Sequence, residues 1–334
     1  MNAVEILSSN LGNESFVEPD GNAKPLLSRR TNRRIIIYLD REVIGPFVNR
    51  STDPSDTIRY RFPDEDGRKG REVVRVPSRK FKSKEKLRGL EVCRAFGLVD
   101  PNYEYNAVES TEMLNNPNSV LFGDTETGGN AAGIPSKFIY GEGLSVEDAA
   151  KAVQPLTHNA LSEEGTMWNR KEGEFRTSLF ETVSVLPGTH IIQTITVDSP
   201  TPESLAHLLI SLTATRYGAQ TSVTGSNIRN RIMVILATTD EPPVTAYTLV
   251  RGTAEGKYTH ENLVELTTRA LSGCSGKVIS GNEAEKLQSD VQKASDLETL
   301  YKNLADQARL FHEFVYPTKS RKKRGAKTEN ISEG

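Results

Sequence analysis

The sequence predicts an α+β protein with a ferredoxin-like core and C-terminal helices. The first observation is a strand ending at Val185, a Pro187-Gly188 turn and a second strand over residues 191–197. The second is a capped amphipathic helix after Thr201, and the third is the apolar run Ile232–Leu236, typical of a buried central strand. The order strand, strand, helix, strand is half of a ferredoxin-like fold.

Alternation and helical spacing define these elements. One face of the second strand presents Ile191, Gln193, Ile195 and Val197. Thr201 can cap the next helix, Pro202 suits its first position, and Glu203 complements the positive end of the helix dipole. One helical face carries Leu205, Leu208, Leu209 and Leu212. We expect this helix to end near Gly218.

Shorter patterns predict the remaining elements. Arg33–Leu39 reads as the first core strand, because β-favouring residues run together there. Ser83 is expected to cap a basic helix that closes at Gly97. The other predicted elements are a strand over Lys137–Tyr140, a helix from Ser145 to before Pro155, a strand over Ala246–Val250, a helix over Glu261–Leu271 and one long helix from Leu287 to Phe311.

The elements group into five predicted segments. Residues 24–48 and 81–250 form the core, residues 49–80 a basic, β-rich inserted subdomain, and residues 155–176 an irregular thumb loop. Residues 251–316 form a helical region, and residues 317–334 a basic tail that we expect to be disordered.

The composition is that of an ordinary folded protein. Of 334 residues, 36% are hydrophobic and 26% charged, which supplies enough apolar material for a core. No apolar run approaches transmembrane length and the N-terminus lacks a signal-peptide pattern, so we expect no membrane partner. Cys93 and Cys274 lie far apart, which argues against a disulfide or a zinc site and favours the cytosol.

The net charge of −2 conceals a strong separation of charge. Between Lys24 and Arg94 there are 20 basic and 10 acidic residues, and Lys319–Lys327 holds 6 basic residues and no acidic one. Cations at this density repel one another unless a polyanion is present, and phosphate binding with counterion release is the natural role. The same charges could instead form a solvated face or discourage aggregation at a strand edge.

We therefore predict a phosphate-binding surface assembled from several parts of the chain. Arginine forks suit phosphate oxygens, and glycines let a backbone approach them closely. The predicted RNA contacts are Lys24, Arg29, Arg30, Arg33, Arg34, Arg68, Lys69, Arg71, Arg75, Arg79, Lys80, Lys82, Lys84, His158, Arg216, Gly218, Gly225, Arg229 and Arg231. Met167 and Trp168, an apolar pair in a polar stretch, are predicted to wedge between bases.

Catalytic motifs are missing from the sequence. Gly273–Val278 resembles a phosphate loop only superficially, because Leu271 and Val278 replace residues that such a loop requires. The histidines are scattered and form no zinc motif. We predict a binding protein without a catalytic residue, metal or cofactor.

In order, these motifs resemble those of the backbone subunit of CRISPR surveillance complexes, a repeat-associated protein with a modified RNA-recognition (ferredoxin-like) fold. The matching features are the basic lead-in to the first strand, Leu121-Phe122-Gly123 after a helix, the Glu181–Thr189 hairpin, and a glycine-and-arginine loop over residues 216–229. Length, early basic insertion and C-terminal helices are most similar to the type I-D Cascade subunit. The resemblance covers about residues 25–250.

The resemblance implies a role in antiviral defence in the prokaryotic cytoplasm. Copies would polymerise along a guide RNA (crRNA), grip its backbone and display it to a complementary target strand, expected to be DNA. The implied partners are the guide, the target single strand, further copies, and the cap, large, small and repeat-processing subunits of Cascade. The palm contacts would be the arginines of residues 29–34 together with the Gly218–Arg231 loop.

Two other functions remain open at this point. Type III relatives cut target RNA with a loop aspartate after the first strand; Asp40, Asp53 and Asp56 lie in that region without a matching motif, so we assign no catalysis. One alternative is an RNA-processing endonuclease of the same fold, and the other is a scaffold protein whose basic segments bind proteins.

Overall fold

The computed structural model describes residues 2–17, 30–50, 56–64, 69–128, 132–159, 166–175, 179–241, 243–253 and 256–317. At its centre lies an eight-stranded antiparallel sheet of order β14-β13-β1-β12-β7-β3-β2, in which β6 also pairs with β12. The strands are β1 Arg34–Val43, β2 Arg59–Arg61, β3 Glu72–Val76, β6 Phe138–Tyr140, β7 Gly143–Asp148, β12 His190–Asp198, β13 Ile228–Thr238 and β14 Lys277–Ser280. Together with the helices, this sheet confirms the predicted α+β class.

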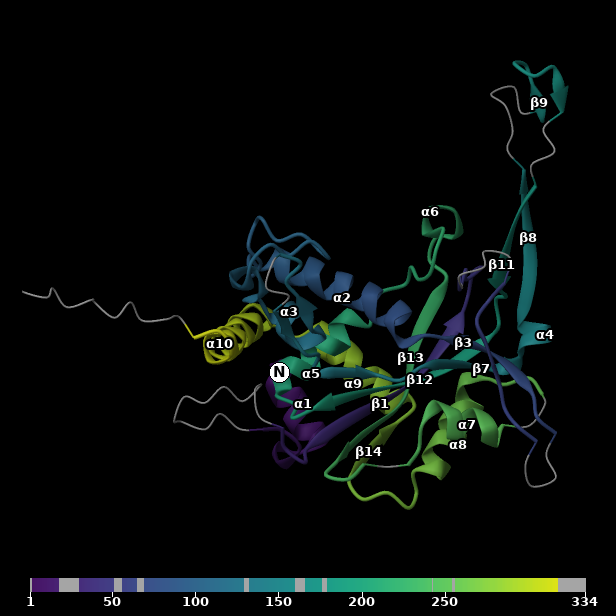
Figure 1. The fold of residues 1–334 in the computed structure, drawn as a ribbon. Helices are drawn as coiled ribbons and strands as arrows, with labels where there is room; N and C mark the ends of the chain where they lie inside the picture. Colours follow the sequence, from purple (N-terminus) through teal and green to yellow (C-terminus); the bar gives the residue numbers. More distant parts are fainter. Residues whose placement is uncertain are drawn as a thin grey trace, which may run out of the picture.

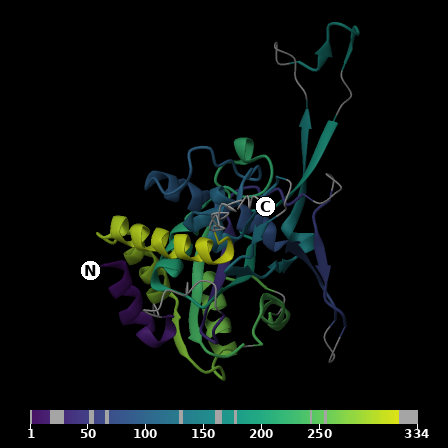
Figure 2. The same cartoon turned by 60° about the vertical axis from the view of Figure 1, so that its left-hand side comes forward.

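Helices cover both faces of the sheet (Figures 1 and 2). They are α1 Ala3–Leu11, η1 Asn13–Ser15, α2 Ser78–Ala95, η3 Thr111–Leu114, α3 Pro117–Phe122, α4 Ala149–Ala152, α5 Pro202–Ser211, α6 Thr221–Thr224, α7 Ala246–Gly252, α8 His260–Ala270, α9 Asn282–Gln292 and α10 Leu297–Val315. The larger core joins one face of the sheet to α1, α2, α3, α5, α9 and α10, and a second core joins the other face to α7 and α8. None of the helices in the described ranges is both long and apolar enough to cross a bilayer.

The central strand β1 serves both cores. Ile35, Ile37 and Leu39 point into the larger core, whereas Ile36 and Tyr38 point into the second. Successive side chains of a strand face opposite sides, so the part of β1 that apolar cores cover on both faces, Ile35–Leu39, is apolar at every position. This explains the continuous apolar run that predicted the first core strand.

An arm projects from the body on the side where α6 stands (Figure 1). Its stem pairs β8 Val153–Asn159 with β11 Leu179–Val185, and its tip pairs β9 Trp168–Asn169 with β10 Glu174–Phe175. The described residues of the predicted thumb loop, 155–159 and 166–175, lie in this arm. The loop was expected to be irregular, but it begins as a regular strand because β11 supplies hydrogen-bonding partners along it.

Two predicted elements have the wrong type. The helix expected from Ser145 begins as strand β7, because Leu144 and Ser145 pair with β12 and are buried there, and only Ala149–Ala152 is helical. The strand expected over Ala246–Val250 is helix α7, which a capping box of Thr245 and Thr248 initiates. In the first case sheet pairing overrides helical propensity, and in the second the cap outweighs the β-favouring residues.

Three helix boundaries also differ from expectation. Helix α2 begins at Ser78 rather than Ser83. Helix α5 ends at Ser211, well before Gly218, because the amide of Asn230 binds the carbonyl oxygens of Leu212 and Ala214 and draws the chain away. The long C-terminal helix is two helices, α9 and α10; between them the Asp296 carboxylate accepts a hydrogen bond from the backbone N–H of Ala3 at 2.9 Å.

The basic segment 49–80 is joined to the main sheet. Strand β3 pairs with β7 on one side and with β2 on the other. Val73, Val74 and Val76 are buried. The described part of this segment therefore extends the sheet toward one edge.

Candidate nucleic-acid interface

The two groups of predicted palm contacts lie at opposite ends of β1. Arg34 pairs in register with Asp198 and Thr238, whereas Glu42 pairs with Arg229. At about 3.3 Å per residue, the strand separates Arg34 from Arg229 by about 26 Å. The structure thus does not bring the N-terminal arginines together with the glycine-and-arginine loop.

The N-terminal arginines are held by the protein itself. The Arg33 guanidinium donates a hydrogen bond to the carbonyl oxygen of Phe16. Arg34 pairs with Glu241 at 2.7 Å and with Asp198 at 3.5 Å. Arg30 is exposed, and Lys24 and Arg29 lie outside the described residues. At this end of β1, Arg30 is the described arginine with an exposed guanidinium left for a ligand.

At the other end of β1, α2 and the loop after α5 form a groove of about 320 Å³. Lys84, Arg88 and Glu91 line it from α2, Thr215 and Arg216 from the loop, and Thr221 from the start of α6. Arg88 pairs with Glu91 at 2.8 Å. Lys84 and Arg216 have no acidic partner within the described ranges, so both positive charges remain available to an anion.

The side chain of Asn227 holds the backbone of the loop that carries Arg216. The side-chain oxygen of Asn227 accepts the backbone N–H of Tyr217 at 2.9 Å, and its amide donates to the carbonyl oxygen of Tyr217 at 2.9 Å. The Tyr217 ring is fully buried. Helix α6, four residues later, therefore projects from a fixed base on the same side of the molecule as the arm (Figure 1).

Gly218 is required by this geometry. Its φ of +78° is a conformation that residues with a Cβ rarely adopt, and an added Cβ would lie 2.5 Å from the Val48 carbonyl oxygen. We expect Gly218→Ala to lower the free energy of unfolding by about 2–4 kcal/mol, from backbone strain plus a clash with main chain. Gly225→Ala is the matched control, since its φ is +66° but nothing lies within 4 Å. Equal losses in urea unfolding would contradict the role of the Val48 contact.

Beneath the groove lies a fully buried ion pair. Arg41 in β1 and Glu85 in α2 are 2.5 Å apart, and neither side chain is exposed. Glu85 also accepts hydrogen bonds from the hydroxyls of Tyr140 at 2.5 Å and Tyr217 at 2.8 Å. Burial lowers the pKa of Arg41, but the Glu85 carboxylate outweighs it and the pKa is raised overall. The pair joins α2, the central strand and the groove loop.

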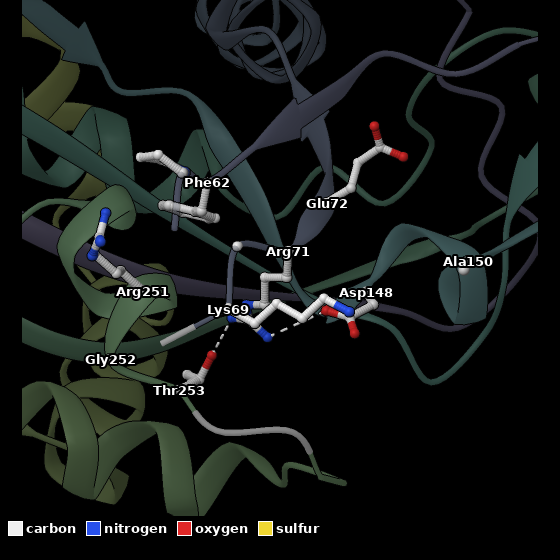
Figure 3. Close-up of a pocket in the computed structure, with 11 residues that line it drawn as sticks. Phe62, Lys69, Arg71, Glu72, Asp148, Ala150, Arg251, Gly252 and Thr253 are labelled. Carbon is white, nitrogen blue, oxygen red and sulfur yellow. Dashed lines mark hydrogen bonds and ion pairs between the residues drawn. The ribbon is translucent and has the colours of Figure 1, made fainter. Parts of the chain in front are cut away.

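Several residues of the basic segment are occupied by structural contacts. Arg71 donates to the carbonyl oxygens of Val146 and Val250 beside a cavity of about 710 Å³, which Lys69 also lines (Figure 3). Arg75 forms a bidentate salt bridge with Glu142. Arg68 lies outside the described residues. These contacts tie the segment to the sheet, which sequence reasoning could not distinguish from phosphate binding.

The N-terminal turns of α2 hold cations in different environments. Lys80 donates to the Asn49 side chain at 2.9 Å, and burial together with neighbouring Arg79 lowers its pKa to about 8. Arg79 is exposed and has no acidic partner in the part of the chain that the structure describes. Arg79 therefore leaves an uncompensated positive charge exposed near the start of α2.

Arg229 and Arg231, at the end of the glycine-and-arginine loop, also differ in their surroundings. Arg229 is exposed and pairs with Glu42 at 3.2 Å. Arg231 is partly buried and pairs with Glu285 at 2.9 Å and with Glu261 at 3.7 Å. Exposed pairs of this kind exchange readily with phosphate, so Arg229 can serve a ligand at modest cost.

At the tip of the arm, Trp168 of the predicted wedge packs against a second aromatic side chain. Trp168 and Phe175 pack edge to face with ring centroids 5.2 Å apart, and they are 40% and 67% exposed. Met167 is half-buried. Sequence reasoning missed Phe175, because only the pairing of β9 with β10 brings it opposite Trp168. His158 lies in β8, and its side chain is outside the described part.

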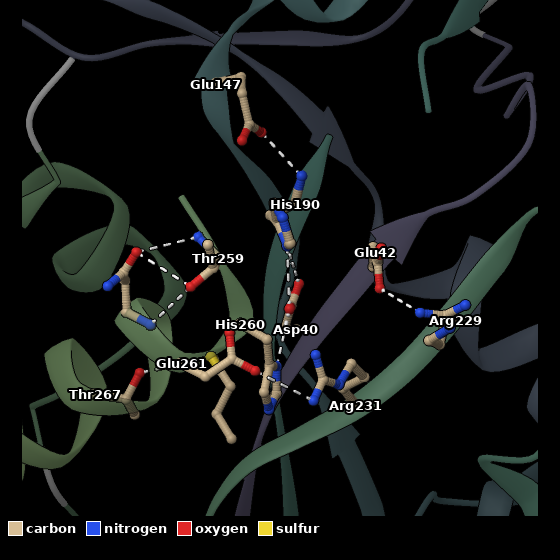
Figure 4. A network of polar contacts seen from close by, with 12 residues as sticks. Asp40, Glu42, Glu147, His190, Arg229, Arg231, Thr259, His260, Glu261 and Thr267 are labelled. Atoms are coloured by element: carbon tan, nitrogen blue, oxygen red, sulfur yellow. Dashed lines mark hydrogen bonds and ion pairs between the residues drawn. The ribbon is translucent and has the colours of Figure 1, made fainter. Parts of the chain in front are cut away.

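Asp40 lies in a buried network with two histidines (Figure 4). Because successive side chains of β1 face opposite sides of the sheet, Asp40 points away from α2, which Arg41 contacts. Its carboxylate is bound by His190 at 3.0 Å and by His260 at 3.0 Å. Asp56 is exposed and pairs with Arg59 at 3.3 Å, and Asp53 is outside the described residues. Asp40, fully buried and held by two rings, cannot reach a bound strand.

This network predicts a dependence of stability on pH. Burial lowers the pKa of His190, but the hydrogen bond to Asp40 outweighs it and the pKa is raised overall. A raised histidine pKa contributes stability that is complete below the unfolded pKa near 6.5 and is lost as pH rises through the folded pKa. We expect His190 to contribute a fall in the free energy of unfolding above pH 6.5, by at most about 1.4 kcal/mol per pH unit.

Urea unfolding at pH 6, 7 and 8 measures this loss. The His190→Gln variant should remove the slope that His190 contributes, since glutamine does not titrate. A variant with the same slope as the wild type would show that His190 is not the source.

Among the described residues, no group of three or more His, Cys, Asp or Glu side chains is arranged to hold a metal ion.

Comparisons with known proteins place the chain in a family. The Csc2 CRISPR family model matches residues 69–309. A crystal structure of Csc2 from Thermofilum pendens is 18% identical, covers 93% of this chain and 96% of that one, and has a TM-score of 0.61. A chain of a CRISPR RNA-guided surveillance complex (pre-nicking) is 10% identical, covers 82% and 99%, and has a TM-score of 0.49. No curated protein matches. The family match spans most of the chain, and this protein belongs to the Csc2 CRISPR family.

Proposed function

We propose that this chain is the crRNA-binding backbone subunit of a type I-D Cascade complex in the prokaryotic cytoplasm. Copies bind the guide backbone, polymerise along it and present the guide to a complementary target strand. The Csc2 family match supports a role in CRISPR defence. The observation that carries the binding role is the groove between α2 and the loop after α5, where Lys84 and Arg216 lack acidic partners within the described ranges.

The arrangement of the groove suits a phosphate backbone. Lysine and arginine charges line it together with the hydroxyls of Thr215 and Thr221, and all of these can donate to phosphate oxygens. These contacts do not depend on base identity, so the affinity is independent of sequence and sensitive to salt. A guide of variable sequence requires this kind of recognition.

The order of the central strands supports a ferredoxin-like (RNA-recognition-type) core. β13, β1, β12 and β6 lie side by side, with α2 following β1 and α5 following β12 along the chain. In this interpretation the projecting arm is the thumb. Its exposed Trp168 and Phe175 serve as the wedge at the interrupted base pair, an aromatic role that stacking on bases supports.

We propose binding without strand cleavage. Asp40 is buried and bound by His190 and His260, so the first strand offers no exposed carboxylate at that position. The further partners would be the cap, large, small and repeat-processing subunits.

Size-exclusion chromatography of the purified chain, before and after ribonuclease, tests the proposal. We expect a large, heterogeneous peak with a high ratio of absorbance at 260 to 280 nm, which collapses to monomer after digestion. A sharp monomer peak with a low ratio, and no shift with single-stranded RNA at low salt, would favour a protein-binding scaffold instead.

A further inference from the structure

A second cationic hollow lies on α2, away from the groove. Lys82 and Lys86, one turn apart, line a space of about 470 Å³ over the hairpin formed by β4 Asp124–Thr125 and β5 Gly133–Ile134. The carboxylate of Asp124 also lines this space, together with Thr127 and Ser136, whose hydroxyls donate to the backbone carbonyl oxygens of Val108 and Phe138. The remaining polar lining residues, Asn106 and Thr125, supply an amide and a hydroxyl that can donate to a ligand. Amide and hydroxyl donors beside a cation are the groups that bind phosphate oxygens.

Only one of the two lysines is compensated. Lys86 pairs with Asp124 at 3.0 Å and donates to the carbonyl oxygen of Gly123 at 2.9 Å. Asp124 also accepts the hydroxyls of Tyr103 at 2.6 Å and Ser119 at 2.7 Å. Lys82 is half-buried and has no acidic partner among the residues that the structure describes. The hollow therefore retains one positive charge.

The hollow and the groove face different ways around the helix. Residues two apart on an α-helix differ by about 200° around its axis, so Lys82 and Lys84 point to nearly opposite sides. The groove is lined by residues from the loop after α5, and the hollow by residues from the β4–β5 hairpin. One straight length of backbone cannot occupy both.

We propose that the hollow beside Lys82 is a phosphodiester site for a second strand, the one that pairs with the bound guide. This inference rests on the proposed function. One uncompensated charge matches one phosphodiester, whereas the groove offers Lys84 and Arg216 together. The lower affinity expected of the hollow suits a strand that must bind and dissociate, and the higher affinity expected of the groove suits a guide that stays bound.

The experiment uses the full chain loaded with a labelled RNA, to which a complementary DNA strand is added. We expect Lys82→Met to weaken binding of the complement by about 5–10-fold and to reduce its salt slope by about 0.7, the loss of one phosphate contact. The sequence pattern grouped Lys82 with the predicted RNA contacts, but its side chain lines the hollow and not the groove, so the affinity for the RNA itself should be unchanged. Lys84→Met is the matched control and should weaken the RNA instead.

A pH series provides a readout that a structural role would not move. Burial and neighbouring Lys86 lower the pKa of Lys82 to about 8. A phosphate needs the charged amine, so the affinity for the complement should fall as pH rises through 8, and Lys82→Met should flatten this fall. The other titratable groups at the site are Lys86, Asp124, Tyr103 and Tyr105.

The outcomes are separable. If Lys82→Met weakens the RNA as much as Lys84→Met does, the hollow belongs to the guide path and the second-strand proposal is wrong. Unchanged affinity for both strands, with binding of inorganic phosphate that depends on Lys82, would assign the hollow to a free anion and also overturn it. A wild-type chain that binds no RNA would instead refute the proposed function.

Discussion

Replacing Glu85 with alanine is expected to lower the free energy of unfolding by about 3–5 kcal/mol. The substitution would leave the fully buried Arg41 guanidinium without its carboxylate. It would also remove the acceptor of the Tyr140 and Tyr217 hydroxyls. An unpaired charge in the interior costs more than the pair contributes, because no water can replace the lost partner. Urea unfolding followed by circular dichroism measures the loss.

Two further variants make this expectation specific. Glu91→Ala removes an exposed carboxylate from the same helix and should cost about 0–1 kcal/mol. The double variant Arg41→Met with Glu85→Leu removes both charges and should recover part of the lost free energy of unfolding. The recovery is only partial, because the hydroxyls of Tyr140 and Tyr217 still lack the Glu85 acceptor, although no unpaired charge stays buried. If Glu85→Ala cost no more than Glu91→Ala, the buried pair would not hold α2 against the sheet.

Reversing both free charges of the groove is expected to have the largest effect on function. Lys84→Glu with Arg216→Glu should weaken binding of single-stranded RNA by about 100-fold, equally for different sequences. The loss of two phosphate contacts should also reduce the salt slope by about 1.4. Fluorescence anisotropy at several salt concentrations measures both quantities.

Net charge alone must be excluded as the cause. Lys293 and Lys302 are exposed at the end of α9 and on α10, and their double reversal changes the net charge equally. We expect that variant to bind RNA within a few-fold of the wild type. A separate Arg30→Glu variant tests the other end of β1. A loss with Arg30→Glu, but none with the groove variant, would move the RNA path to that end.

The sequence predicted the elements whose patterns are local. The strand, turn, strand and capped helix around Pro187-Gly188 and Thr201 are present as β11, β12 and α5, and Ile232–Leu236 lies within β13. Periodicity and capping depend on neighbouring residues, so one sequence suffices to see them. The helix predicted from Ser145 was wrong because pairing with a distant strand makes that segment a strand. The strand predicted over Ala246–Val250 was wrong because a capping box that was not recognised begins a helix there.

The cations show where local reasoning ends. Arg34, Arg71 and Arg75 look like Lys84 and Arg216 in the sequence, yet the first three are paired within the protein. Arg41 and Glu85 are 44 residues apart, and nothing in the sequence indicates that they share a buried site. Trp168 meets Phe175 only through the register of the arm.

By itself, then, the sequence determined the α+β class, the order of the central elements and the concentration of charge, all of which follow from composition and short-range pattern. The resemblance to a known family rested on the order of its short motifs. The tertiary structure alone decided which cations remain open to a ligand, which are used to hold the fold, and that the two sides of α2 face different surroundings. The physical reason is that a charge is available or neutralised according to what lies within about 4 Å of it, and for these residues those partners come from distant parts of the chain.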